Sequence, residues 1–266
     1  DHIGFANFPV SEYIEMMKIA YAETKKAAPE MSVLTGGYTG MPGSSPKMRE
    51  KDHMTRTLTE GKGSYDVLAF HGHGSMSSYR NQVDRLVKMR RDLGIEAPWY
   101  ANETAISAIL IGEMKQAETL FQKFLYSWAN GAIGYNWYDL RNDGFDPNAN
   151  EHNFGLITRD FQPKAAYAVY NALSGTYREA EFLRAVRFGG NIEAFLFRAG
   201  DGRLLLAVWN NDPGCDGTSV FPAFPAGRRK STCSEMWLPC RFEAANWYSR
   251  QGAARSPSGW KRMPPN

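Results

Sequence analysis

Apolar positions in the first 175 residues alternate between helical spacing and short continuous runs. Apolar residues recur at helical spacing after Val10, which predicts a helix that ends before Pro29. The same spacing predicts three more helices, over residues 79–93, 114–128 and 163–173. Between the helices stand four apolar runs that predict buried strands: MSVLTGG (31–37), YDVLAFHGHGS (65–75), APWYANE (97–103) and GAIGYNWYDL (131–140).

Four strands separated by helices indicate an α/β fold whose strands pair in parallel through right-handed crossovers. A doubly wound sheet and a (β/α)8 TIM barrel both produce this pattern. Polar or aromatic residues end three of the strands, namely His71, Glu103 and Trp137. They favour the barrel, because functional residues gather on that rim of a barrel. Four strand–helix units make half of a barrel.

The pattern changes after Gly175. Residues 178–212 read as strand, turn, strand, turn, strand, with GGN (189–191) and GDGR (200–203) as the turns. We therefore predict half of a TIM barrel over residues 1–175 and the start of an antiparallel β-sandwich over residues 176–227.

Composition and charge exclude several classes of partner. Of 266 residues, 43% are hydrophobic and 22% are charged, which is typical of a globular protein. The longest strongly apolar run, AISAILIG (105–112), is far shorter than the roughly 20 residues that span a bilayer. The three cysteines have no metal-like spacing. We expect no membrane partner, no metal and no cofactor.

The net charge of +3 comes from the last 39 residues. Residues 228–266 hold eight Lys/Arg and two Glu, a net of +6, so the first 227 residues carry −3. A nucleic-acid partner would rest on this segment alone, and we expect none. The segment is rich in Arg, Trp and Pro and has no strand period, so we hypothesise a frameshift near residues 225–230. A genuine disordered basic tail is the alternative.

Glu103, His71 and Trp137 are the candidates for chemistry. Side chains alternate across a strand, so each shares a face with the residues two and four positions before it. If these faces point into a barrel, an acid, an imidazole and an indole meet in one pocket. A carboxylate beside aromatic rings suits glycoside hydrolysis. Each residue can also be explained by structure alone. Glu103 could be an acid that is favoured at a helix N-terminus, His71 a hydrogen-bonded histidine, and Trp137 a core residue.

Two rival functions remain open at this point. His71 and His73 form a His-x-His pair at a strand end, which could bind a divalent metal in an amidohydrolase-like enzyme. That architecture needs further ligands on later strands, and only His152 follows. A carbohydrate-binding protein without catalysis, with Trp99, Trp137 and Tyr138 as the sugar-contacting residues, is the other rival.

Several sequence segments resemble segments in the C-terminal half of clan A glycoside hydrolases, in particular the family 39-like group of xylosidases and exopolysaccharide hydrolases. The segments are YDVLAFHGHGS, APWYANETA, ANGAIGYNWYDLRNDG and HNFGLITRDFQPKAAYAVYNAL. The resemblance covers roughly residues 1–175 and implies strands five to eight of the barrel, with a β-sandwich as a common companion.

The resemblance also implies roles. Glu103 would be the nucleophile of a retaining, double-displacement hydrolase acting on a poly- or oligosaccharide. His71 would orient it, and Asn102, Trp137 and Tyr138 would bind the sugar. The family's acid/base is a Glu in an Asn-Glu-Pro-like motif, which this sequence lacks. We therefore expect a chain that begins just after that motif, has little turnover alone, and belongs to a secreted or periplasmic bacterial protein.

Overall fold

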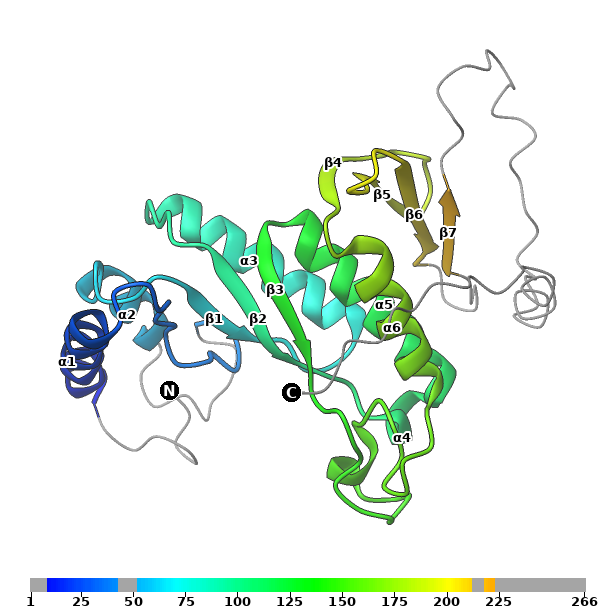
Figure 1. Cartoon of the computed structure of the whole chain (residues 1–266), viewed down its shortest axis with the longest axis horizontal. Coiled ribbons are helices and arrows are strands. Elements are labelled where there is room, and N and C mark those ends of the chain that lie inside the picture. The colour runs from blue at the N-terminus through cyan, green and yellow to red at the C-terminus, as the bar shows by residue number, and fades with distance from the viewer. Residues whose placement is uncertain (1–8, 43–51, 212–217, 223–266) are drawn as a thin grey trace, which may run out of the picture.

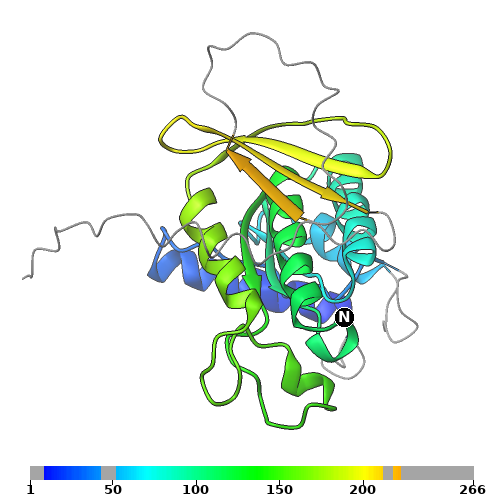
Figure 2. The ribbon, with the colours of Figure 1, turned by 90° about the vertical axis from the view of Figure 1, so that its right-hand side faces the viewer.

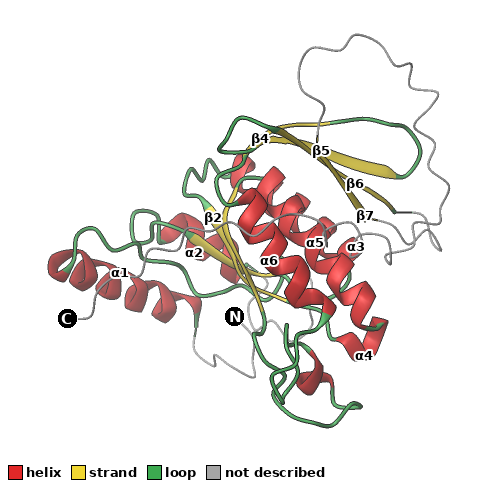
Figure 3. Ribbon diagram, turned by 45° about the vertical axis from the view of Figure 1, so that its right-hand side comes forward, coloured by secondary structure: helices red, strands yellow, loops and turns green. Residues whose placement is uncertain are grey.

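The computed structural model describes residues 9–42, 52–211 and 218–222 (Figure 1). Three helices form a middle layer between a parallel sheet and an antiparallel sheet (Figures 1 and 3). In the described ranges, none of the helices has the length and apolar character needed to cross a membrane. The segment 228–266, on which the frameshift hypothesis rests, lies outside the described residues.

The parallel sheet contains β1 (Leu68–His71), β2 (Trp99–Thr104) and β3 (Ala132–Trp137), in that order. These three predicted strands are confirmed. The first predicted strand, 31–37, is wrong as a regular strand. This segment makes only isolated parallel bridges to β1 and its flank, from Leu34 to Val67 and from Tyr38 to Phe70. The glycine pair between the two bridges offers no side chains to pack, which weakens a strand.

The helices follow the predicted order, with additions. They are α1 (Val10–Ala27), α2 (His53–Glu60), α3 (Met76–Asp92), α4 (Ala108–Ile111), α5 (Glu113–Ala129), the 3-10 helix η1 (Asn150–Asn153) and α6 (Ala165–Tyr177). Helix α3 begins where the Ser75 hydroxyl accepts a hydrogen bond from the backbone N–H of Ser78, an N-cap. Helices α2, α4 and η1 were not predicted.

The parallel sheet is open rather than closed into a barrel. Helices α3, α5 and α6 cover one of its faces (Figure 1). On the other face, the Ile133 side chain is 56% exposed and Asn136 is also exposed. The observed fold is thus a mixed α/β arrangement with three parallel strands and one bridging segment, and the second face of the sheet is exposed at β3.

The second sheet is antiparallel and contains β4 (Glu181–Ala185), β5 (Ile192–Arg198), β6 (Leu204–Asn210) and β7 (Thr218–Pro222). The first three of these strands were predicted, and β7 is added by the structure. Among the described residues this sheet has no second sheet facing it, so the predicted sandwich is not seen. Its apolar face packs on the helices instead (Figure 2).

Aromatic contacts join the antiparallel sheet to the helices. The Tyr177 and Phe197 rings are 5.1 Å apart, and the Tyr126 and Phe195 rings are 6.0 Å apart. Arg80 on α3 forms an ion pair with Glu193 on β5. One hydrophobic core therefore continues from the parallel sheet through the helices to the antiparallel sheet. The predicted boundary at Gly175 falls inside α6, and the division into domains stays a prediction.

Candidate active site

A bulge near the end of β2 sets the direction of Glu103. Residues Ala69 and His71 of β1 pair with Tyr100 and Glu103, so β2 has one extra residue over this stretch. The same extra residue shows on the other side, between Ala101 and Thr104. The predicted alternation is therefore wrong: Trp99 and Ala101 are fully buried, whereas the Glu103 side chain is 34% exposed. Bulges commonly re-aim side chains in this way near functional sites.

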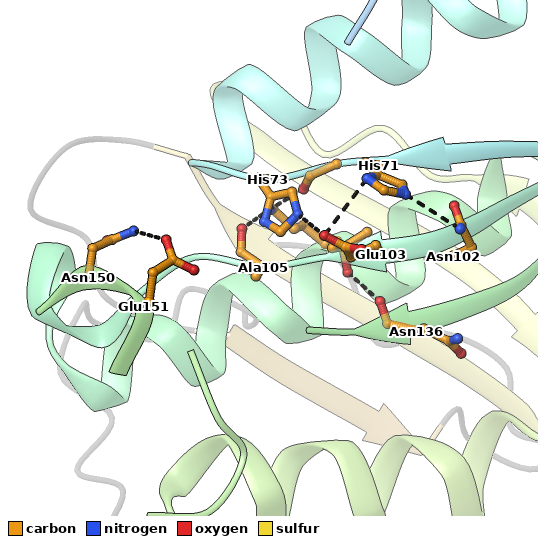
Figure 4. Close-up of polar contacts among 11 residues, drawn as sticks. His71, His73, Asn102, Glu103, Ala105, Asn136, Asn150 and Glu151 are labelled. Carbon is orange, nitrogen blue, oxygen red and sulfur yellow. Dashed lines mark hydrogen bonds and ion pairs between the residues drawn. The ribbon is translucent and has the colours of Figure 1, made fainter. Parts of the chain in front are cut away.

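Two imidazoles converge on one oxygen of Glu103 (Figure 4). His73 Nε2 donates a hydrogen bond to Glu103 Oε1 over 2.8 Å, and His71 Nδ1 lies 3.8 Å from the same oxygen. His71 was predicted to orient Glu103, but His73, considered in the sequence only as a metal ligand, makes the closer contact. The Glu103 Oε2 atom accepts no hydrogen bond from any described residue, so one oxygen is held and the other is free.

Backbone contacts between β1 and β2 fix the histidines. Gly72 N–H donates to the Glu103 carbonyl over 2.8 Å, and Gly74 N–H donates to the Ala105 carbonyl over 2.8 Å. On its other side, the His71 ring lies against Gly37, where an added Cβ would stand 1.9 Å from His71 Nε2. The glycine at position 37 is therefore needed for the observed ring position.

The buried Lys123 of α5 forms hydrogen bonds with the backbone just after β1 and just after β2. Its Nζ atom donates to the carbonyl oxygens of Gly72, over 2.7 Å, and Ala105, over 3.0 Å. Its side chain is fully buried, and burial lowers its pKa to about 7. In the described part of the chain no carboxylate pairs with it, although its ammonium lies 5.1 Å from the centre of the Tyr79 ring. Sequence reasoning missed this residue, because a single lysine in a helix is usually on the surface.

His71 is kept neutral near pH 7. Burial is the main cause that lowers its pKa; the nearby Glu103 carboxylate opposes this lowering, and the interaction with His73 adds to it. The Asn102 side-chain amide donates to His71 Nε2 over 3.5 Å. In this arrangement His71 Nδ1 carries the hydrogen and faces Glu103. Asn102 thus contacts the histidine, and its predicted role in sugar binding stays a prediction.

The predicted aromatic residues divide between the site and the core. The Tyr138 ring lies 5.9 Å from the His73 ring, and Phe154 lies 6.0 Å from it. Trp137 is only 7% exposed, and its indole N–H donates to the Phe154 carbonyl over 2.9 Å. Trp137 does not share a face with Ile133, as strict alternation predicted, because a register shift intervenes in β3. Phe154 is also buried and packs against Tyr138, so Tyr138 is the partly exposed aromatic residue beside His73.

Asp139 is a second unusual carboxyl group and was not predicted. Burial, followed by the negative charge of Asp143, raises its pKa to about 6, while Lys164 partly opposes this rise. Its Oδ1 atom is buried without a partner among the described residues. The group directly follows Tyr138, whose own pKa is raised by burial and by Asp143. The only sequence signal was its position just after a strand end.

The structure adds one possible ligand, Glu103, to the metal site that His71 and His73 suggested. His71, His73 and Glu103 each offer one ligand atom within 4.8 Å of the other two. The third histidine considered, His152, lies in the short helix η1 and not in the predicted loop, and its Nδ1 accepts a hydrogen bond from Asp146 N–H over 3.3 Å. It is not part of this cluster in the described structure.

Comparisons with known proteins found structures of similar fold but no match by sequence. No protein-family model and no curated protein matches this sequence. A family 39 glycoside hydrolase from the gut symbiont Bacteroides cellulosilyticus WH2 has a similar structure, with a TM-score of 0.63 and 21% identity over 75% of this chain. A GH51 arabinofuranosidase from Xanthomonas axonopodis pv. citri matches with a TM-score of 0.53 and 13% identity over 77% of this chain.

Both neighbours are clan A glycoside hydrolases, and the predicted resemblance to that clan is confirmed at the level of the fold. The chain spans 44% of the length of the first neighbour and 49% of the second. It therefore overlaps part of each (β/α)8 glycosidase structure.

Proposed function

We propose that this chain carries the nucleophile of a retaining glycoside hydrolase, that Glu103 is this nucleophile, and that the substrate is a poly- or oligosaccharide. The position of Glu103 carries the proposal. It ends a parallel strand, is one-third exposed, and is held by His73 through Oε1 alone. Active sites of (β/α)8 enzymes lie at this end of the strands. The fold shared with clan A enzymes adds support.

The reaction proceeds in two displacements. Glu103 Oε2 attacks the anomeric carbon while the bond from that carbon to the leaving oxygen breaks, and a second carboxyl group protonates the leaving oxygen. The same group, now a carboxylate, then takes a proton from water. The water oxygen attacks the anomeric carbon and releases the Glu103 carboxylate. The hydrogen bond from His73 fixes Oε1 and leaves Oε2 directed to the anomeric carbon.

The two displacements need a partner carboxyl group roughly 5–5.5 Å from Glu103. The sequence has no Asn-Glu-Pro motif, and the chain spans less than half of its neighbours. We therefore assign the acid/base residue to a part of the parent protein outside these 266 residues. In this proposal segment 31–37 and strands β1, β2 and β3 correspond to strands five to eight of a barrel.

Sugar contacts complete the proposal. Tyr138 lies beside His73 and offers an aromatic face with a hydroxyl group, which suits a pyranose or furanose ring. Asn102 and His71 are assigned to hydrogen bonds with the sugar next to Glu103. Trp137 contributes from the core, through its hydrogen bond to Phe154, whose ring packs against Tyr138. The sugar and the linkage are left to the experiment.

Aryl glycosides with a dinitrophenyl leaving group test the nucleophile without the acid, because this leaving group departs without a proton. We expect slow hydrolysis of one sugar in a panel, and a loss of at least about a hundredfold in Glu103→Gln. Glu96→Gln, an exposed acid just before β2, is the matched control and should keep the rate. Sugar binding without hydrolysis, unchanged in Glu103→Gln, would support the carbohydrate-binding rival instead.

A further inference from the structure

The His71, His73 and Glu103 cluster has the composition of a transition-metal site. Two imidazoles and one carboxylate each present one ligand atom, and these atoms lie within 4.8 Å of one another. Figure 4 shows the two rings and the carboxylate turned toward one another at the ends of β1 and β2. Nitrogen and carboxylate donors in this proportion suit Zn²⁺ and similar ions, whereas Mg²⁺ and Ca²⁺ prefer oxygen donors alone.

The distances are close to those that an ion would impose. Bonds of about 2.0–2.1 Å in a tetrahedral site place neighbouring donor atoms about 3.3 Å apart. His73 Nε2 is 2.8 Å from Glu103 Oε1, and His71 Nδ1 is 3.8 Å from it. Movements of a few tenths of an ångström in the partly exposed His73 and Glu103 side chains would bring both distances to that value.

We propose that His71, His73 and Glu103 bind one divalent transition-metal ion of the Zn²⁺ class, with a fourth position open to water or to a sugar hydroxyl. The side chains of His73 and Glu103 are 38% and 34% exposed, so one side of the cluster is accessible. If Glu103 is the nucleophile, a consequence that rests on the proposed function follows: the bound ion occupies the carboxylate and inhibits hydrolysis.

The surroundings of His71 support binding through Nδ1. A metal-bound imidazole usually donates its other N–H to an oxygen acceptor. The Asn102 Oδ1 atom is buried without a partner among the described residues. Its amide nitrogen lies 3.5 Å from His71 Nε2. Turning this amide over brings Oδ1 to Nε2, which would then carry the hydrogen and leave Nδ1 free for the ion.

The backbone beneath the cluster is rigidly held. Lys123 donates to the carbonyl of Gly72, which lies between the two histidines, and to the carbonyl of Ala105, two residues after Glu103. Glu103 and the His71–His73 pair therefore stay in register when no ion is present. Such preorganisation lowers the free-energy cost of bringing the ligands together.

Metal titration of the untagged chain tests the inference. All three cysteines are replaced by serine in every variant, so that no thiolate contributes. Co²⁺ is titrated into EDTA-treated protein at pH 7.5 in a non-coordinating buffer and followed by its visible d–d absorption. Zn²⁺ is then added, and its binding is measured by calorimetry. We expect one ion per chain and displacement of Co²⁺ by Zn²⁺.

Two variants test the ligands, and a third is their control. His73→Ala and Glu103→Gln should each weaken Zn²⁺ binding at least about tenfold and remove the Co²⁺ spectrum. His152→Ala, which removes an imidazole outside the cluster, should bind as the parent does. Circular dichroism verifies that each variant is folded. The inference would be overturned if the parent shows no stoichiometric binding, or if His73→Ala and Glu103→Gln bind Zn²⁺ as strongly as the parent does.

These readouts do not depend on turnover. If metal binding requires His73 and Glu103 but Glu103 reacts with no sugar, the metal-site proposal is supported and the glycosidase proposal is refuted. The reverse pair of results would refute the metal site alone.

Discussion

The Nζ atom of Lys123 lies 2.7 Å from the carbonyl oxygen of Gly72, beneath the strand end that bears both site histidines. The same lysine holds the Ala105 carbonyl, after Glu103. A helix-borne cation thus joins the ends of β1 and β2 at the point where their side chains converge. The relationship makes α5 part of the site's support, and it can be tested through pH.

Lys123 makes stability depend on pH between neutral and mildly alkaline conditions. Its pKa is about 7 in the folded chain and about 10.5 in the unfolded chain, so the unfolded chain binds more protons in this interval. The free energy of unfolding should therefore rise by about 2 kcal/mol from pH 7 to pH 9 through this group. Urea titrations of the parent and of Lys123→Met should show the rise only in the parent. An equal rise in both would contradict this account of Lys123.

Gly37→Ala should displace the His71 ring without unfolding the chain. The new Cβ would stand 1.9 Å from His71 Nε2, so the ring must move. We expect a changed His71 signal in NMR spectra of the imidazole rings and weaker activity of the Glu103 site. Gly175→Ala is the control. Its Cβ meets no atom within 4 Å in helix α6, and it should raise stability by about 1 kcal/mol. An unmoved His71 signal in Gly37→Ala would show that the ring does not rest on Gly37.

Asp139→Asn should stabilise the chain at pH 7. The raised pKa, about 6, means that folding disfavours the Asp139 carboxylate, and this cost grows as pH rises from about 4 to 6. The amide removes the cost. After allowance for solvent screening of this half-exposed group we expect a gain of about 1 kcal/mol at pH 7. Thermal melts should show the gain at pH 7 and little difference at pH 4. A loss of stability at pH 7 would contradict it.

Phe197→Ala should destabilise the whole chain rather than the antiparallel sheet alone. Phe197 is fully buried, and its ring lies 5.1 Å from that of Tyr177 on α6. Removal of a buried phenylalanine ring costs about 3–5 kcal/mol. A single unfolding transition that moves as one unit is expected, because one core joins the two sheets. Phe188→Ala, at an exposed position, should change little. Two separate transitions would instead favour independent domains.

Local patterns in the sequence were enough to predict strands β1–β3 and β4–β6 and helices α1, α3, α5 and α6. They were also enough to bring Glu103 and His71 together, because parallel strand ends meet at one edge of a sheet. The bulge in β2 could not be predicted, since it depends on hydrogen bonds between strands and not on the residues of one strand. Alternation therefore placed Glu103 with Trp99, and Trp137 with Ile133, wrongly.

The remaining features of the site depend on long-range packing. His73 was considered only as a metal ligand, and its hydrogen bond to Glu103 follows from the turn after β1. Lys123 and Asp139 have ordinary sequence surroundings, and only burial makes them unusual. The predicted sandwich was not found in the described residues because the apolar face of the β4–β7 sheet already packs on the helices. Sequence periodicity indicates that a sheet face is apolar, but it does not identify the layer that covers it.

Covalent trapping of Glu103 tests the central claim most directly. In a 2-deoxy-2-fluoro glycoside with a dinitrophenyl leaving group, the leaving group departs without a proton, so the glycosyl-enzyme forms without an acid residue. The fluorine then slows hydrolysis of that glycosyl-enzyme, which allows it to be detected. Peptide mass spectrometry should then find one sugar ester, on Glu103, in the parent chain and in Glu96→Gln, and no ester in Glu103→Gln. An ester on a different carboxylate, or no ester with any sugar of a broad panel, would contradict the assignment of Glu103 as the nucleophile.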